Sequence, residues 1–89
     1  MTYVPSPDAA CAAVEDGAVV LHMRTKRYFS LNETGAAIWQ MLEDGVALPE
    51  IATRLAEMYE IDAAAADGSV MRLLAELAAE ELITLPAAP

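Results

Sequence analysis

The sequence has little of several residue types on which common functions depend. It contains one cysteine, Cys11, so no disulfide can form within the chain, and a lone cysteine fits the reducing cytoplasm. It contains one histidine, His22, whereas a metal site needs several His, Cys or carboxylate ligands that converge. We therefore expect a cytoplasmic protein with no metal and no cofactor.

Long apolar runs and basic segments are also missing. No run reaches the roughly 20 apolar residues that a membrane-spanning helix needs, and no basic segment precedes an apolar stretch near the start, so we expect neither a membrane span nor a secretory signal. Five Lys and Arg stand against 14 Asp and Glu, for a net charge of −9. Because binding to nucleic acid depends on many basic side chains, this balance argues against it.

The length of 89 residues suits one small domain. Residues 1–8 contain two prolines and are expected to be an irregular lead-in, residues 9–85 the single domain, and residues 86–89 a tail.

Alternating apolar residues between Ala9 and Leu31 predict an antiparallel meander of three strands. Asp16-Gly17 is typical of a two-residue hairpin turn, which would set Val14 opposite Val19. A three-residue loop at 25–27 would pair Met23 with Phe29 and keep the large apolar residues on one face. In this register Val19, Leu21, Met23, Phe29 and Leu31 form the core face, and His22 lies on the solvent side opposite a half-buried Cys11.

From Asn32 the apolar spacing changes to that of helices. Asn32 is a good N-cap for a helix that Asp44-Gly45 ends, and Pro49 suits the first turn of a second helix. A third helix is expected over about 65–81, with an inner stripe at Val70, Leu73, Leu74 and Leu77, and residues 82–85 are a candidate terminal strand. The predicted fold is α+β, a three-stranded antiparallel sheet followed by a three-helix winged helix-turn-helix-like unit.

Such a helical unit raises the alternative of a winged-helix transcription regulator. The third helix offers only one cation, Arg72, among several acidic residues, which would repel DNA. An enzyme is not expected either, because Cys11 and His22 are the only possible Cys–His pair and no third group is evident to orient them.

Two features indicate a binding surface. The last strand, Tyr28–Leu31, has a free edge without proline or inward charge, and such an edge accepts an extended peptide by β-augmentation unless the lead-in or residues 82–85 cover it. Beside the core stripe of the third helix, Met71, Ala75 and Ala78 form a small apolar flank. Together, the edge and the flank predict a slot for a peptide.

The segment 27–39, RYFSLNETGAAIW, resembles the PqqD-like family, as do Pro49-Glu50-Ile51-Ala52 and the later apolar positions, over about residues 14–85. The resemblance implies a recognition domain for the leader of a ribosomally synthesised, post-translationally modified peptide. The leader would add as a strand along the third strand and rest against the third helix. The implied binding residues are Arg27, Tyr28, Phe29, Ser30, Leu31, Met71, Leu74, Ala75 and Ala78.

The short chain is similar to the free-standing proteins of lasso-peptide clusters, which implies a separate leader peptidase of the cysteine-protease type and a cyclase as partners. A chaperone of the pyrroloquinoline quinone pathway, serving a radical SAM enzyme, is the alternative within the family. Lys26 stands where relatives often have glycine. We expect a monomer or an edge-mediated dimer, and expect Leu74→Asp or Met71→Glu to abolish peptide binding without unfolding.

Overall fold

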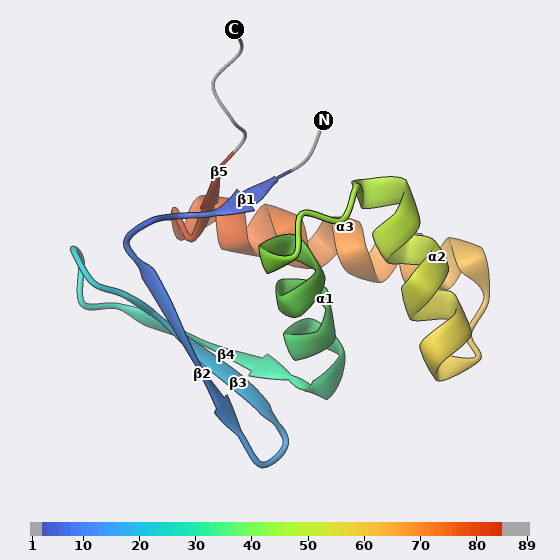
Figure 1. The fold of residues 1–89 in the computed structure, drawn as a ribbon, viewed down its shortest axis with the longest axis horizontal. Helices are drawn as coiled ribbons and strands as arrows, with labels where there is room; N and C mark the ends of the chain where they lie inside the picture. The colour runs from blue at the N-terminus through green and yellow to red at the C-terminus, as the bar shows by residue number, and fades with distance from the viewer. Residues whose placement is uncertain (1–2, 85–89) are drawn as a thin grey trace, which may run out of the picture.

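The computed structural model describes residues 3–84, in which the sheet comes first and the helices follow (Figure 1). Strands β2, β3 and β4 form an antiparallel sheet in that order, so the predicted α+β fold is confirmed. The elements are β1 Val4–Pro5, β2 Ala9–Val14, β3 Gly17–His22, β4 Tyr28–Asn32, α1 Glu33–Glu43, α2 Leu48–Tyr59, α3 Ala63–Ala79 and β5 Ile83–Thr84.

The first hairpin turns at Glu15 and Asp16, one residue earlier than the sequence predicts. Val14 pairs with Gly17, the first residue of β3, whereas the prediction set Val14 opposite Val19. Gly17 is required there because a Cβ would overlap the carbonyl oxygen of Leu31 on the neighbouring strand. The glycine therefore serves the close approach of β4 and not the turn itself.

The second hairpin also differs from the prediction, since its loop spans residues 23–27. Lys26 has φ of 65°, its N–H donates to the carbonyl of His22, and His22 donates to the carbonyl of Arg27, both at 2.8 Å. Lys26 and Arg27 thus lie opposite the single residue His22, and Lys26 is left-handed. This arrangement is a G1 bulge, in which glycine is preferred at the first position. This bulge explains why Lys26 occupies a position that suits glycine.

The longer loop moves the core to the other face of β3. Val20 pairs with Phe29 and Ala18 with Leu31, so the predicted pairing of Met23 with Phe29 is wrong. Val20 is 0% exposed and Met23 is 49% exposed. Residues on both faces of β3 are apolar in sequence, so the length of the loop decides which face is buried. The register between β3 and β4 differs by three residues from the predicted one, and an odd difference exchanges the buried and exposed faces.

His22 and Cys11 consequently exchange environments. His22 is buried at 2% exposure, and its Nδ1 accepts the N–H of Thr25 at 3.4 Å, whereas the sequence placed it on the solvent side. Cys11 is exposed and pairs with Val20, while Ala9 is the partner of His22. The predicted opposition of Cys11 and His22 is therefore wrong.

The helices begin and end close to the predicted positions. The Asn32 side chain accepts the Gly35 N–H at 2.8 Å and caps α1, and Gly45, with φ of 76°, follows its end. Pro49 lies in the first turn of α2, as predicted. Met58 of α2 is 58% exposed, although its spacing from the buried Leu55 would suit the inner face of the helix.

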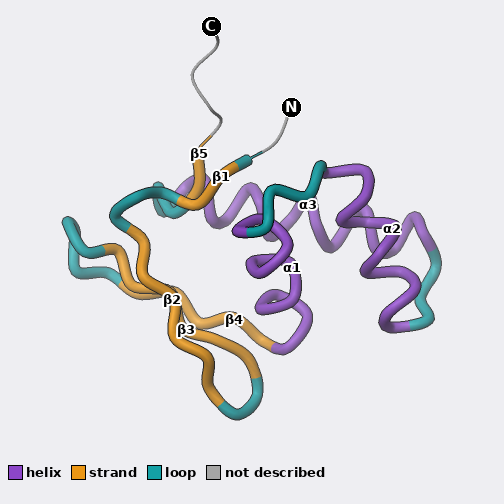
Figure 2. Tube along the Cα trace, viewed as in Figure 1, coloured by secondary structure: helices purple, strands orange, loops and turns teal. Residues whose placement is uncertain are grey.

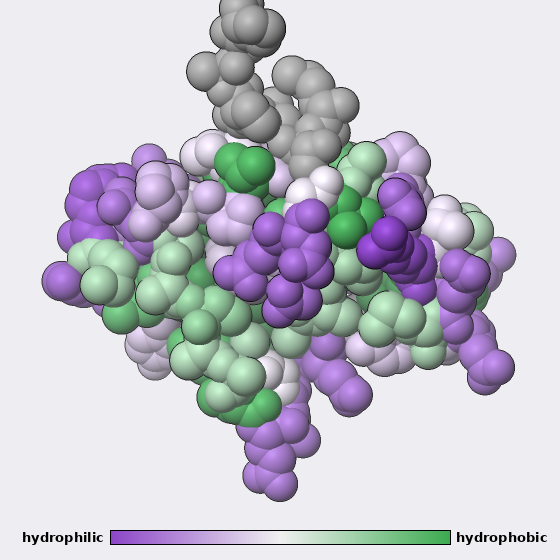
Figure 3. Space-filling model, viewed as in Figure 1, coloured by the Kyte–Doolittle hydropathy of each residue, from purple (hydrophilic) through white to green (hydrophobic). Residues whose placement is uncertain are grey.

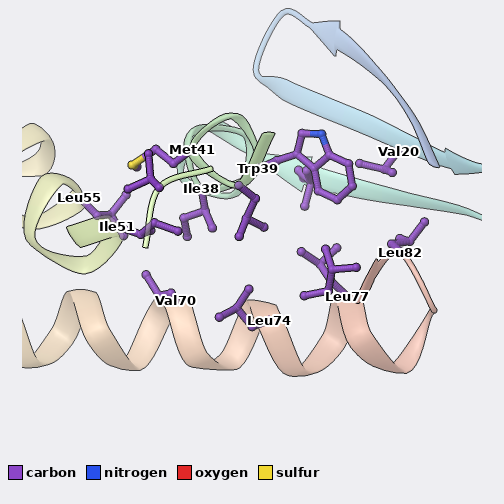
Figure 4. Close-up of a cluster of buried hydrophobic side chains, with 14 of the residues drawn as sticks. Val20, Ile38, Trp39, Met41, Ile51, Leu55, Val70, Leu74, Leu77 and Leu82 are labelled. Carbon is purple, nitrogen blue, oxygen red and sulfur yellow. The ribbon is translucent and has the colours of Figure 1, made fainter. Parts of the chain in front are cut away.

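A single hydrophobic core joins the sheet to all three helices. In Figure 4 the side chains of Leu74 and Leu77 point from α3 toward Ile38 and Trp39 of α1, and Val70 points toward Ile51 of α2. Trp39 is 1% exposed, and its indole N–H has no hydrogen-bond partner within the described residues. Leu82, beyond the end of α3, completes the core at its far end (Figure 4).

The two ends of the described chain lie side by side (Figure 2). Strand β1 pairs with β5, and the Ser6 N–H donates to the carbonyl of Leu82 at 2.8 Å. The lead-in is thus not wholly irregular, and the predicted terminal strand is confirmed at Ile83 and Thr84. Leu85 and the predicted tail lie outside the described residues.

Candidate functional site: the free edge of β4 and the adjoining face of α3

Strand β4 pairs with β3 on one side only. Because β1 pairs with β5 and β2 lies at the opposite side of the sheet, no strand within residues 3–84 pairs with the other edge of β4. The sequence left open whether the ends of the chain would fill this edge. They pair with each other instead, so the backbone groups of this edge have no partner strand among the described residues.

The hydrogen-bonding pattern identifies the backbone groups at this edge. His22 and Arg27 form a hydrogen-bonded pair, and such pairs alternate with non-hydrogen-bonded ones along an antiparallel ladder. Phe29 therefore points its N–H and C=O toward β3, whereas Tyr28 and Ser30 point theirs outward. Tyr28 and Ser30 thus give the free edge two donors and two acceptors at the spacing of a strand.

The side chains of β4 divide between its two faces. Phe29 is half-buried and Leu31 is 5% exposed, so these two belong to the core side. Tyr28, at 72% exposure, and Ser30 lie on the solvent side. A guest strand on this edge would likewise place alternate side chains toward the core side, where α3 lies.

A hollow of about 270 Å³ lies between the end of β4, the start of α1 and one flank of α3. Ile38 and the half-buried Leu73 supply apolar surface, and Arg72 and Glu76 bring charge. The complete lining is Asn32, Thr34, Gly35, Ile38, Ser69, Arg72, Leu73 and Glu76. The mixture suits a peptide, which brings both apolar and polar groups, better than a purely apolar ligand.

Two ion pairs join the second hairpin to the end of α3. Arg27, directly before β4, reaches Glu80 at 3.4 Å, and Arg24 reaches Glu81 at 3.5 Å. The start of β4 thus lies beside the end of α3, while Asn32 at the end of β4 shares the hollow with Ser69. Strand and helix therefore run in opposite directions, with the Arg27–Glu80 pair at one end of the space between them and the hollow, called the groove below, at the other.

The helix residues predicted for the slot do not line this hollow. Leu74 is 2% exposed and belongs to the core, so Leu74→Asp would bury a charge and unfold the protein, contrary to the expectation from sequence. Met71, at 52% exposure, Ala75 and Ala78 lie outside the hollow. At 100° per residue they fall on one side of the core stripe, and Arg72, Leu73 and Glu76 fall on the other.

Sequence reasoning missed Ser69, Arg72 and Glu76 as groove residues because it sought an apolar flank. One signal was present: Leu73, assigned to the inner stripe, is the apolar residue nearest the polar flank. An intermediate position between core and charged residues is typical of a groove wall. The direction in which α3 crosses the sheet, which decides between its flanks, is a tertiary feature.

The two side chains considered as a nucleophile–base pair do not meet. Cys11 stands apart from His22, and partial burial, followed by the nearby charge of Glu43, raises the pKa of the Cys11 thiol. Within residues 3–84 no three His, Cys, Asp or Glu side chains gather as a metal site would require. In the same range no helix combines the length and apolar character needed to cross a bilayer.

Comparison with known proteins now identifies the family. The family described as coenzyme PQQ synthesis protein D (PqqD) matches residues 17–83, which include the sheet edge and all three helices. The chain belongs to the PqqD family. No curated protein matches the chain significantly.

Two solved structures share the fold of this PqqD-family chain over nearly its whole length. One, described as TbiB1 in complex with the TbiA(beta) leader peptide, superposes with a TM-score of 0.87 at 30% identity, covering 96% of this chain and 99% of that one. The other, lasso peptide synthetase B1 complexed with the leader peptide, gives 0.83 at 30% identity, with 97% and 100% covered.

Proposed function

We propose that this protein is a non-catalytic recognition protein that binds the leader segment of a ribosomally synthesised precursor peptide. The leader adds to the free edge of β4 and lays alternate side chains into the groove along α3. The observation that carries the proposal is the unpaired edge of β4, whose end adjoins a hollow lined by both apolar and charged side chains. Two structural relatives, both complexes with a leader peptide, support it.

In this proposal the backbone of β4 and the side chains of the groove have different roles in binding. The outward groups of Tyr28 and Ser30 pair with any extended main chain, so they supply affinity with little demand on sequence. The groove beside Leu73 and Arg72 contacts every second side chain of the guest and supplies selectivity. A flexible leader loses entropy when it becomes a strand, which moderates the net affinity and permits release.

The benefit for maturation is effective concentration. A leader held on β4 keeps the attached core peptide near any enzyme that also contacts this protein, so that enzyme acts on a tethered substrate. We propose a separate leader peptidase of the cysteine-protease type as that enzyme, with a cyclase acting afterwards. The likeness to lasso peptide synthetase B1 supports this choice.

A second candidate comes from the description of the family itself. Its members are described by a role in coenzyme PQQ synthesis, which favours a peptide chaperone for a radical SAM enzyme. Both candidates use the same groove and differ in the partner enzyme. Analytical sedimentation of the protein with each purified enzyme separates them, because the proposal expects a complex with the peptidase and none with the radical enzyme.

Titration of the isotope-labelled protein tests peptide binding directly. The probes are the TbiA(beta) leader peptide and linear peptides recovered from a random display library with the wild-type protein as bait. The amide signals of Tyr28 and Ser30 and those along Ser69–Glu76 are expected to shift together. Binding that shifts only signals of β2, or no binding by any probe, would contradict the proposal.

A further inference from the structure

Arg72 is an arginine without an ion-pair partner in the described residues 3–84. In that range Arg24 pairs with Asp8 and Glu81, Arg27 with Glu80, and Arg54 with Glu50. The free guanidinium lines the groove at the Asn32 end of β4. In a chain of net charge −9, where acidic partners are plentiful, an unpaired arginine in the binding groove is a distinctive feature.

Glu76 lines the same groove one helical turn beyond Arg72. No ion pair joins the two side chains within the described residues, and an Arg that precedes a Glu by four positions has the less favourable orientation for such a pair. The groove therefore presents one positive and one negative group side by side. Arg72 is nearer the Asn32 end of β4, and Glu76 is nearer the end that Arg27 and Glu80 close.

The spacing of these charges matches an extended guest. Four residues of an α-helix rise about 6 Å along its axis. Side chains on one face of a strand repeat every two residues, about 6.4–6.8 Å. Two successive groove-facing side chains of a peptide on β4 therefore stand opposite Arg72 and Glu76, with Leu73 beneath them as apolar surface.

We propose that Arg72 and Glu76 select the guest by charge, and that this chain prefers an acidic side chain at the Asn32 end of the groove and a basic one two positions toward Tyr28. This inference rests on the proposed function and adds the chemistry of the peptide to it. The backbone edge accepts any extended segment, whereas the charge pair distinguishes peptides of the same length and apolarity. Selectivity arises because a reversed peptide sets like charges opposite each other.

The test exchanges the two charges without changing composition. The double variant R72E/E76R keeps the net charge and both side-chain types on α3. The matched control is E50R/R54E, which exchanges the exposed Glu50–Arg54 pair, 2.9 Å apart on α2 and outside the groove. A random display library of linear peptides is selected in parallel against the wild type, the exchange variant and the control.

Wild type and control are expected to enrich peptides with an acidic and a basic residue two positions apart, and R72E/E76R to enrich the reverse order. In separate titrations, each selected peptide should bind the protein that selected it about two- to fivefold more tightly than the protein with the exchanged charges, and this ratio should fall in high salt. Identical enrichment by wild type and R72E/E76R would overturn the charge inference and leave the proposed function standing. No enrichment by any of the three proteins would overturn both.

Discussion

The two outer edges of the sheet are both unpaired within the described residues, but their surroundings differ. Strand β2 is exposed along almost its whole length and contributes much of the apolar surface that covers the sheet in Figure 3. Strand β4 runs beside α3, and a hollow lies next to its end. An open edge therefore supplies backbone pairing, whereas selectivity needs a second element that contacts the side chains of the guest.

The largest effect is expected from proline at the β4 edge. In Ser30→Pro the lost N–H points outward, so the pairing with β3 remains while a guest carbonyl loses its donor. Peptide affinity should fall on the order of a hundredfold, as for a buried acceptor left unpaired. Fluorescence polarisation with a library-selected peptide measures the loss.

The matched control is Ala13→Pro on the outer edge of β2. Because Val14 and Gly17 flank a two-residue turn as a hydrogen-bonded pair, Ala13 points its N–H outward as Ser30 does. Affinity should be unchanged in this variant. An equal loss of affinity in both variants would contradict the claim that the peptide binds at the β4 edge and not at the β2 edge.

The next effect concerns the two flanks of α3. Leu73→Glu places a charge on the half-buried wall of the groove and should weaken peptide binding about tenfold. Met71→Glu, on the opposite exposed flank, should leave the affinity unchanged and the fold intact. The same titration on both variants decides which flank contacts the guest, and a loss confined to Met71→Glu would favour the flank that the sequence indicated.

A smaller effect is expected in the hairpin that leads into β4. Lys26→Gly keeps the left-handed conformation but removes its cost to a residue with a side chain, about 1–2 kcal/mol, partly offset by the flexibility of glycine when unfolded. The free energy of unfolding should rise by about 0.5–1 kcal/mol in urea denaturation. The exposed Thr25→Gly serves as control and should not stabilise. A decrease for Lys26→Gly would argue against the bulge.

The smallest effect is expected at Cys11 on the β2 side. The raised pKa leaves less thiolate near pH 8, so alkylation by iodoacetamide should be slower than for a free cysteine. Glu43→Gln removes the lesser of the two causes and should raise the rate by less than about twofold. Addition of the peptide should leave the rate unchanged, whereas protection would locate the guest on β2.

The helical part of the fold could be predicted from sequence, because the Asn32 cap, Pro49 and Gly45 act over one or two turns. The buried face of the sheet could not be predicted, because Val19, Val20 and Leu21 make both faces of β3 apolar and a bulge at Lys26 sets the register. The edge of β4 was predicted from its composition. The flank of α3 that lines the hollow could not be chosen from sequence, because the crossing of helix and sheet depends on tertiary packing.

Amide hydrogen exchange at Tyr28 and Ser30 tests the central claim most directly. Both N–H groups point to the free edge, so they should exchange rapidly in the protein alone and become protected when a selected peptide is added. Phe29, already bonded to β3, should change little. If Tyr28 and Ser30 stay unprotected with peptide bound, the guest does not extend the sheet at β4 and the account is wrong.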